Sequence, residues 1–330
     1  MLLDRGAFFH TDSEALDHQT LNTVHNLGLL YREQGRLEEA EEMYQRALAG
    51  KEKALGPDHI STLDTVRNLG LLYTDQGKLK DAEEMFQRAL AGYKEALSPE
   101  HPSTLYAINN IGTLYRNQGK LKEAEEMYQQ ALAGTEKVLG PDHTSTLDTV
   151  HNLGLLYADQ GKLKEAEEMY QRALAGKEKA LGPDHTSTLD TVNNLGLLYK
   201  DQGKLKEAEE MYQRALAGYE KALGTDHTST LDIVHNLGLL YRKQGKLKEA
   251  EVMYQRALAG YRRPLGPDHS KTRMVADNLA TLTTFSAEQE TPQPTSPILS
   301  ASQDLDFNTL PSSLSARHRK RDTLHRIFRR

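Results

Sequence analysis

The sequence predicts an all-α protein, built as a solenoid of antiparallel helix pairs that stack in chain order. Three observations lead to this fold class. A 42-residue unit recurs along most of the chain, each unit holds two apolar stripes of helical period, and turns containing Gly or Pro separate the stripes. No segment shows the alternation of apolar and polar residues, with a period of two, that is typical of a strand.

The repeated unit is clearest from Thr146 to Ser187, and its leading Thr marks the start of each copy. The leading residues are Thr20, Thr62, Thr104, Thr146, Thr188, Thr230 and Thr272. Six units are complete, and the seventh keeps only its first half, residues 272–285. We therefore expect an irregular entry at residues 1–17, a superhelix at 18–285 that ends in a capping helix at 272–285, and a tail at 286–330.

The first helix of each unit is predicted by apolar residues at steps of three, four and one. In the unit that begins at Thr146 they are Leu147, Val150, Leu153, Gly154 and Tyr157. Gly161 then suits the left-handed conformation that follows a helix end.

The second helix is predicted to begin near Lys162 and to run to Leu181. The loop Gly182-Pro183-Asp184-His185 ends it, because Pro183 cannot extend the helical ladder and Asp184 or His185 can cap the next helix. Small residues allow the two axes to approach closely, and we expect Gly154 and Ala166 to face each other within the pair.

The unit resembles the tetratricopeptide repeat, a helix-turn-helix motif. The matching residues are Leu153, Gly154, Tyr157, Gly161, Ala166, Tyr170 and Ala173, and the match recurs in all six units. The resemblance spans residues 17–283 and implies a right-handed superhelix with a concave groove. The 42-residue length is similar to that of the kinesin light chain repeats, and equally to the tandem arrays at the ends of fungal and bacterial signalling ATPases.

Composition excludes several classes of function. The chain has no Cys, which excludes disulfides, thiol chemistry and Cys-ligated zinc. No apolar run approaches the ~20 residues of a membrane helix, and a net charge of -6 gives no support to a nucleic-acid-binding surface. The first ten residues lack the pattern of a signal peptide, and the absence of Cys fits the cytoplasmic location that we expect.

Recurring Asp-His pairs are the feature that suggests catalysis or a metal site. They are Asp58-His59, Asp142-His143, Asp184-His185, Asp226-His227 and Asp268-His269. Either chemistry needs several such groups within a few ångströms, whereas these pairs lie one per unit on successive loops, where helix capping explains them better. Since phosphate-loop, nucleophile-elbow and zinc-protease motifs are also missing, the sequence predicts no enzyme, no cofactor and no metal site.

A row of Asn residues is the strongest candidate for a binding site. One Asn precedes the Leu-Gly or Ile-Gly of each first helix: Asn26, Asn68, Asn110, Asn152, Asn194 and Asn236, with Asn278 in the seventh unit. The resemblance implies that this position points into the concave groove, where an amide can both donate to and accept from a bound main chain. The alternative is that each Asn bonds a neighbouring helix and fixes the pair.

Two neighbouring positions differ between otherwise near-identical units, and there we expect partner specificity. The position before the Asn holds His25, Arg67, Asn109, His151, Asn193 and His235. The position after the Tyr holds Arg32, Thr74, Arg116, Ala158, Lys200 and Arg242. These neutral and basic side chains favour an acidic or carboxylate-bearing partner.

The same positions argue against recognition of a chaperone C-terminus. Chaperone-binding members of the family hold two carboxylates with Lys and Asn on the first helix. Here the equivalent places hold His25 with Leu29, or Arg67 with Leu71.

The predicted function is a non-catalytic protein–protein interaction scaffold that binds a peptide segment of a partner in the groove. The alternative is a sensor or oligomerisation arm of a larger signalling protein, a STAND-type ATPase, of which this chain is a fragment. Near-identical units also permit self-association.

In the tail, the stretch rich in Ser, Thr, Pro and Gln is expected to be disordered. The basic cluster from Arg317 to Arg330 is interpreted as a solvated end, with a nuclear-import patch, a membrane-surface helix and a self-ligand as alternatives.

Overall fold

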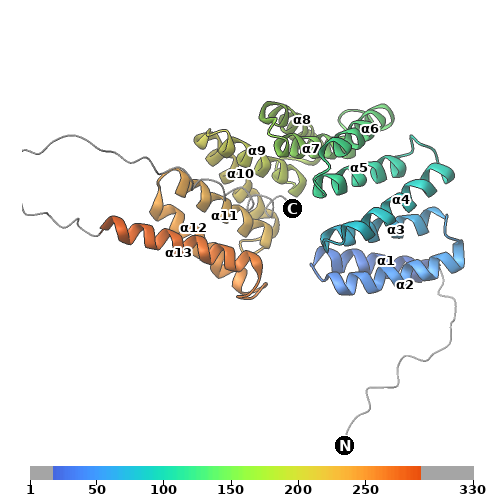
Figure 1. Cartoon of the computed structure of the whole chain (residues 1–330), viewed down its shortest axis with the longest axis horizontal. Helices are drawn as coiled ribbons and strands as arrows, with labels where there is room; N and C mark the ends of the chain where they lie inside the picture. The colour runs from blue at the N-terminus through green and yellow to red at the C-terminus, as the bar shows by residue number, and fades with distance from the viewer. Residues whose placement is uncertain (1–17, 291–330) are drawn as a thin grey trace, which may run out of the picture. The chain divides into compact units, whose positions relative to one another are not determined.

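The structure is a computed structural model that describes residues 18–290, and the side chains of residues 19–284. Thirteen α-helices and no strand lie within these residues, and consecutive helices pack as antiparallel pairs (Figure 1). The first helices of the six pairs are α1 (His18–Glu33), α3 (Ile60–Asp75), α5 (Pro102–Asn117), α7 (Thr144–Asp159), α9 (Thr186–Asp201) and α11 (Thr228–Lys243). The second helices are α2 (Leu37–Leu55), α4 (Leu79–Ala96), α6 (Leu121–Leu139), α8 (Leu163–Leu181), α10 (Leu205–Leu223) and α12 (Leu247–Arg262).

A last helix, α13 (Ser270–Glu290), packs on the sixth pair without a second helix of its own among the described residues. The predicted division at residue 285 falls inside this helix. The predictions for residues 1–17 and for the basic cluster lie outside the described residues.

The turn inside each pair depends on a glycine. Gly161 has a φ of +75°, which lets its N–H donate to the carbonyl oxygen of Ala158 (3.1 Å) while Lys162 N–H donates to that of Tyr157 (2.9 Å). The Lys162 ammonium lies 5.2 Å from the centre of the Tyr157 ring, a cation–π contact that recurs in the other units. The sequence prediction of a left-handed glycine at this position is confirmed.

The loop between pairs uses histidine as the helix cap. His185 has extended backbone, and its Nδ1 accepts a hydrogen bond from the Ser187 N–H (3.2 Å). The hydroxyl of Thr188 donates to the Gly182 carbonyl oxygen (2.9 Å) and closes the loop. The capping role predicted for the Asp-His pairs is therefore confirmed for the histidine.

Packing within a pair is set by one glycine and one aromatic ring. A Cβ atom placed on Gly154 would lie 2.7 Å from ring carbons of Tyr170, so the ring fills the space that a side chain would need. The three atoms nearest to that Cβ all belong to the Tyr170 ring, a contact that the sequence analysis did not predict beside the expected pairing of Gly154 with Ala166. The equivalent pairs are Gly28 with Tyr44, Gly70 with Phe86, Gly112 with Tyr128, Gly196 with Tyr212 and Gly238 with Tyr254.

The same aromatic ring joins each unit to the next. Tyr170 is buried in one cluster with Ala166 of its own helix and with Leu195 and Leu198 of α9. Each unit therefore lacks a complete core until its neighbour is in place, as expected of a solenoid.

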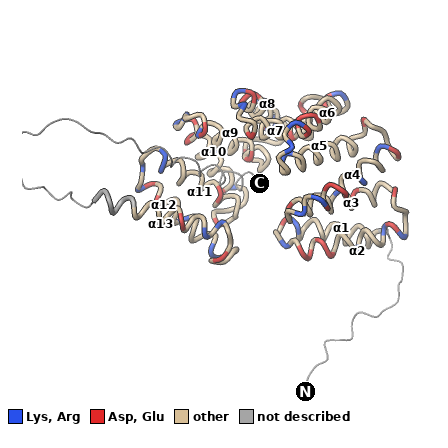
Figure 2. The backbone as a smooth tube through the Cα atoms, in the orientation of Figure 1, with Lys and Arg blue, Asp and Glu red and all other residues tan. Residues whose placement is uncertain are grey.

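Successive first helices approach each other to within 8 Å between Cα atoms, as α7 does with α9, and successive second helices show no comparable approach in the described part. The stack therefore curves with its first helices on the inner side. Charged residues are more frequent on the second helices, as α8 shows against α7 (Figure 2). No helix among those described has the length and apolar character needed to cross a membrane.

Candidate functional site

The candidate site is the surface that α1, α3, α5, α7, α9 and α11 form on the inner side of the stack, which we call the inner surface. Both predicted rows of residues lie on these helices. Because neighbouring first helices lie close together, side chains from one unit reach those of the next.

The Asn row forms a ladder between units. In five of the seven Asn residues the side-chain amide points back to the residue that precedes the Asn of the previous unit. The amide nitrogen is hydrogen-bonded to His25 in Asn68 (3.0 Å), to Asn109 in Asn152 (3.3 Å), to His151 in Asn194 (3.2 Å), to Asn193 in Asn236 (3.1 Å) and to His235 in Asn278 (2.9 Å). The two rows that the sequence analysis treated separately are therefore one hydrogen-bonded system, and the bonds join successive pairs.

One rung of the ladder is missing, and the sequence explains why. The residue opposite Asn110 is Arg67, whose guanidinium has no acceptor atom. The Asn110 amide nitrogen is accordingly buried without a hydrogen-bond partner. At the N-terminal end, Asn26 is exposed, since no described helix precedes α1.

The histidines of the row are buried and neutral. The hydroxyl of Thr65 donates to the Ser61 carbonyl oxygen, so it accepts from His25 Nδ1 (3.0 Å), and His25 Nε2 is left to accept from Asn68. The His25 ring also packs edge-on against Tyr44, 5.5 Å between centroids. Burial, and secondarily the charge of Lys51, lower the pKa of His25 to about 4.

His151 has the same surroundings as His25, whereas Val275 stands beside His235 where the other two histidines have a Thr. His151 Nδ1 lies 3.0 Å from the Thr191 hydroxyl, and burial lowers the pKa of His151 to about 3. Burial also lowers the pKa of His235 to about 4. These imidazoles act as hydrogen-bonding spacers between units and carry no charge near neutral pH.

Two buried lysines extend this system, and the sequence analysis did not single them out. Lys51 and Lys177 are each only 2% exposed, at the same position of α2 and α8. Lys177 pairs with the carboxylate of Asp148 (2.8 Å). In the first unit Asn22 stands where the fourth unit has Asp148, and Lys51 instead donates to the Ser61 carbonyl oxygen (3.2 Å) and the Thr65 hydroxyl (3.1 Å).

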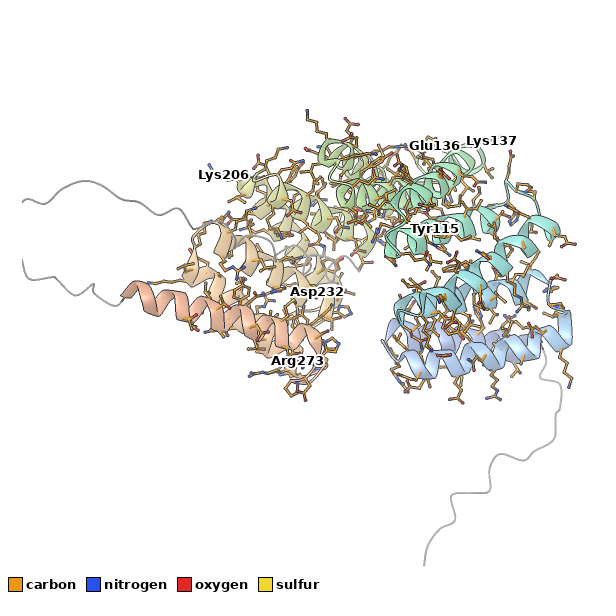
Figure 3. All side chains as sticks on the ribbon, viewed as in Figure 1. Tyr115, Glu136, Lys137, Lys206, Asp232 and Arg273 are labelled. Carbon is orange, nitrogen blue, oxygen red and sulfur yellow. The ribbon has the colours of Figure 1, made fainter. Side chains whose placement is uncertain are left out.

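An acidic row near the beginning of the first helices was also missed. Asp64 accepts a hydrogen bond from the Tyr93 hydroxyl (2.6 Å). Burial and the neighbouring carboxylate of Asp64 raise the pKa of Tyr93 above its ordinary value, so the phenol remains a donor. The equivalent pairs are Tyr219 with Asp190 and Tyr261 with Asp232, the last on α11 (Figure 3). An Asp two residues after the leading Thr of a unit is the sequence feature that could have identified this row.

The predicted basic residues differ in their surroundings. Arg116 pairs with Asp159 of the next unit (3.4 Å) and its side chain is only 7% exposed. Lys200 is buried, and its carbonyl oxygen accepts from Lys243 (2.6 Å). Arg242 is the exposed member of this set.

The chemistry of the inner surface is that of hydrogen bonding. No group of three or more potential metal ligands lies together in the part of the chain that the structure describes. Carboxylates, phenols and amides hold one another in fixed positions along the helices, and Asn152, Asn194 and Asn236 remain partly exposed. Such an arrangement places polar atoms at regular spacing along the inner surface.

Stacked helix pairs with a polar ladder along their inner side define a helical-repeat protein of the solenoid class. The tetratricopeptide repeat family model matches most of the described chain, at residues 19–95, 103–179, 151–221, 187–263 and 229–290. The chain belongs to the tetratricopeptide repeat family.

Solved structures with a similar fold support this assignment and the right-handed solenoid that the sequence predicted. A putative kinesin light chain of Podosopora anserina, with nearly identical TPR-like repeats, is 28% identical, with a TM-score of 0.50, 64% of this chain covered and 99% of that one. BtubC (BKLC) from P. vanneervenii is 20% identical, with a TM-score of 0.51 and coverage of 84% and 99%. A Rap protein complexed with Competence and Sporulation Factor is 16% identical, with a TM-score of 0.60 and coverage of 83% and 78%. Among curated proteins, no match was found.

Proposed function

We propose that the chain is a non-catalytic scaffold that binds a peptide segment of a partner protein along the inner surface. The observation that carries this proposal is the hydrogen-bonding capacity that the ladder amides have left. Each ladder bond uses one hydrogen of the Asn152, Asn194 or Asn236 amide, so the second hydrogen and the oxygen are available to a main chain. An extended peptide presents its own N–H and C=O groups at regular spacing, and amides bind them whatever the side chains are.

The ladder has a second consequence for binding. Because each Asn is already held by its neighbour, little side-chain entropy is lost when a peptide binds. The two interpretations that the sequence left open, recognition and fixing of the pair, are therefore compatible in one residue. The Rap protein that shares this fold was solved in complex with a factor, and its likeness extends to the fold alone.

The charge preference of the site is expected to be weaker than the sequence suggested. An acidic partner was predicted from residues such as Arg116, Lys200 and Arg242. Arg116 is paired and Lys200 is buried, which leaves Arg242 as the exposed cation of the three. We therefore propose that main-chain recognition dominates and that an acidic side chain adds to it near α11.

The test begins with a displayed library of random peptides, selected on the purified full chain. Affinity of a selected peptide is then measured for the parent, Asn152→Ala and Asn194→Ala. Each variant should weaken binding by about 2- to 10-fold, the equivalent of one net hydrogen bond. Glu168→Ala is the control, since Glu168 is exposed on the second helix α8. Equal losses in all three variants, or none, would place the peptide on another surface.

A further inference from the structure

At the N-terminal end of the stack, formed by α1 and α2 (Figure 1), no described helix packs on the face of α1 that in later units meets the preceding second helix. Leu30 of α1 is 47% exposed. The equivalent residues of the following units are at most 3% exposed: Leu72, Leu114, Leu156, Leu198, Leu240 and Leu282. Thr23, two turns earlier on α1, is likewise exposed, although its equivalent Thr65 is fully buried.

The other units show what covers this face. Leu72 is buried against Ala40 and Tyr44 of the preceding second helix, and Leu198 against Ala166 and Tyr170. The same Ala and aromatic residue, four positions apart, recur beneath Leu114, Leu156, Leu240 and Leu282. The natural complement of the α1 face is therefore a second helix with this apolar stripe.

A charged residue beside the face supports the same complement. Arg214 pairs with Glu178 of the preceding second helix, and Arg88, Arg172 and Arg256 make the equivalent ion pairs. Arg46 of α2 is the residue in the same position, and it is exposed and forms no ion pair with a residue that the structure describes. A helix that carries the Glu178 equivalent would meet Arg46 as Glu178 meets Arg214.

The opposite end of the stack has a different character. On α13 the positions that contact a second helix in other units have changed: Ala280 replaces the glycine, and Arg273 (Figure 3) stands where the other first helices have Leu. Such substitutions suit a helix whose free side faces water. On α1 the position that packs on the preceding second helix in the other units is still a leucine, Leu30, so this face has the side chain of an internal junction.

We propose that this face of α1, which no described helix covers, is a docking surface for the second helix of a tetratricopeptide-type unit in a partner protein. A second copy of this chain does not supply that helix, because α2, α4, α6, α8, α10 and α12 are each covered by the following first helix. The proposal concerns a surface separate from the inner surface and does not depend on peptide binding there.

The probe is a fluorescently labelled peptide of residues 163–182, the sequence of α8, with a lactam between Lys164 and Glu168 to hold the helix. Both of these residues are exposed in α8, so the lactam leaves the apolar stripe intact. Fluorescence anisotropy with the full chain should show saturable binding. Leu30→Glu should weaken binding at least about tenfold, since the contact buries most of a leucine. Val252→Glu, at another exposed apolar residue, is the matched control and should bind as the parent does.

A charge exchange tests the orientation. Arg46→Glu should weaken binding of the probe, and a probe carrying Glu178→Arg should bind the Arg46→Glu variant better than it binds the parent. The proposal would be overturned if the probe showed no saturable binding, or if it bound Leu30→Glu as tightly as Val252→Glu. A charge exchange between Arg46 and Glu178 that did not restore binding would have the same consequence. It would also be overturned if the full chain formed a dimer that Leu30→Glu dissociates, or if the probe bound only after residues 1–17 were removed.

Discussion

The missing rung at Asn110 allows a stabilising substitution to be predicted from the ladder. Arg67→Asn would place an amide oxygen opposite Asn110, as Asn109 does for Asn152 at 3.3 Å and Asn193 does for Asn236 at 3.1 Å. The buried Asn110 amide nitrogen would then gain the partner that it lacks. An unsatisfied buried donor costs about 1–3 kcal/mol, and a typical intramolecular hydrogen bond contributes a net of about 0.5–1.5 kcal/mol.

The reference for this gain is Arg67→Ala, which removes the guanidinium without adding an acceptor. Both variants lose the charge and the hydrogen bond that Arg67 places beside Tyr93, so their difference contains the new bond and the lower helix propensity of Asn. We expect Arg67→Asn to exceed Arg67→Ala by about 1–2 kcal/mol in the free energy of unfolding, or about 2–5 °C in the thermal midpoint. Circular dichroism at 222 nm, during heating and during urea titration, measures both quantities.

A double-mutant cycle with Asn110→Ala completes the test. In the parent background Asn110→Ala should cost little, because no bond is lost, whereas in the Arg67→Asn background it should remove the gain. If Arg67→Asn and Arg67→Ala had the same stability, or if the cycle showed no coupling between positions 67 and 110, the view of the ladder as an energetic link between units would be refuted.

Three further outcomes follow from the packing and the titration of buried groups. Gly154→Ala should destabilise the chain by about 1–3 kcal/mol in urea unfolding, because the new methyl group would lie 2.7 Å from the ring of Tyr170, and an unchanged midpoint would contradict this contact. Burial lowers the pKa of His151 from 6.5 to about 3 in the folded state. Its contribution to stability is therefore complete above pH 6.5 and is lost as the pH falls from 6.5 toward 3. His151→Asn, which keeps an acceptor for the ladder, should therefore flatten the decline of the thermal midpoint between pH 6.5 and 4, and an unaltered slope would disprove a neutral imidazole. Asn22→Asp should raise the thermal midpoint by giving the buried Lys51 the carboxylate that its counterpart in the fourth unit has, and a lower midpoint at pH 7 would count against that reading.

The helices and their boundaries could be read from the sequence because they depend on local geometry. The apolar stripe from Leu147 to Tyr157 has helical period, and Gly161 and His185 end and begin helices through contacts within a few residues. Because the units are nearly identical, the helix boundaries predicted for one unit apply to the whole array. The repetition also showed which residues form rows on the first helices.

The partners of these residues depended on the tertiary structure. Which side chain meets Asn68, and whether Arg116 is solvated or paired with Asp159, follows from how far one first helix is displaced along the next. That displacement places contacts 43 residues apart in the ladder, a separation that no period within one unit reveals. The sequence by itself therefore determined that this is a solenoid of helix pairs. Only the stacking decided that its Asn residues bond one another's units and that Leu30 remains exposed, because both depend on what lies beside a helix and not on the helix's own residues.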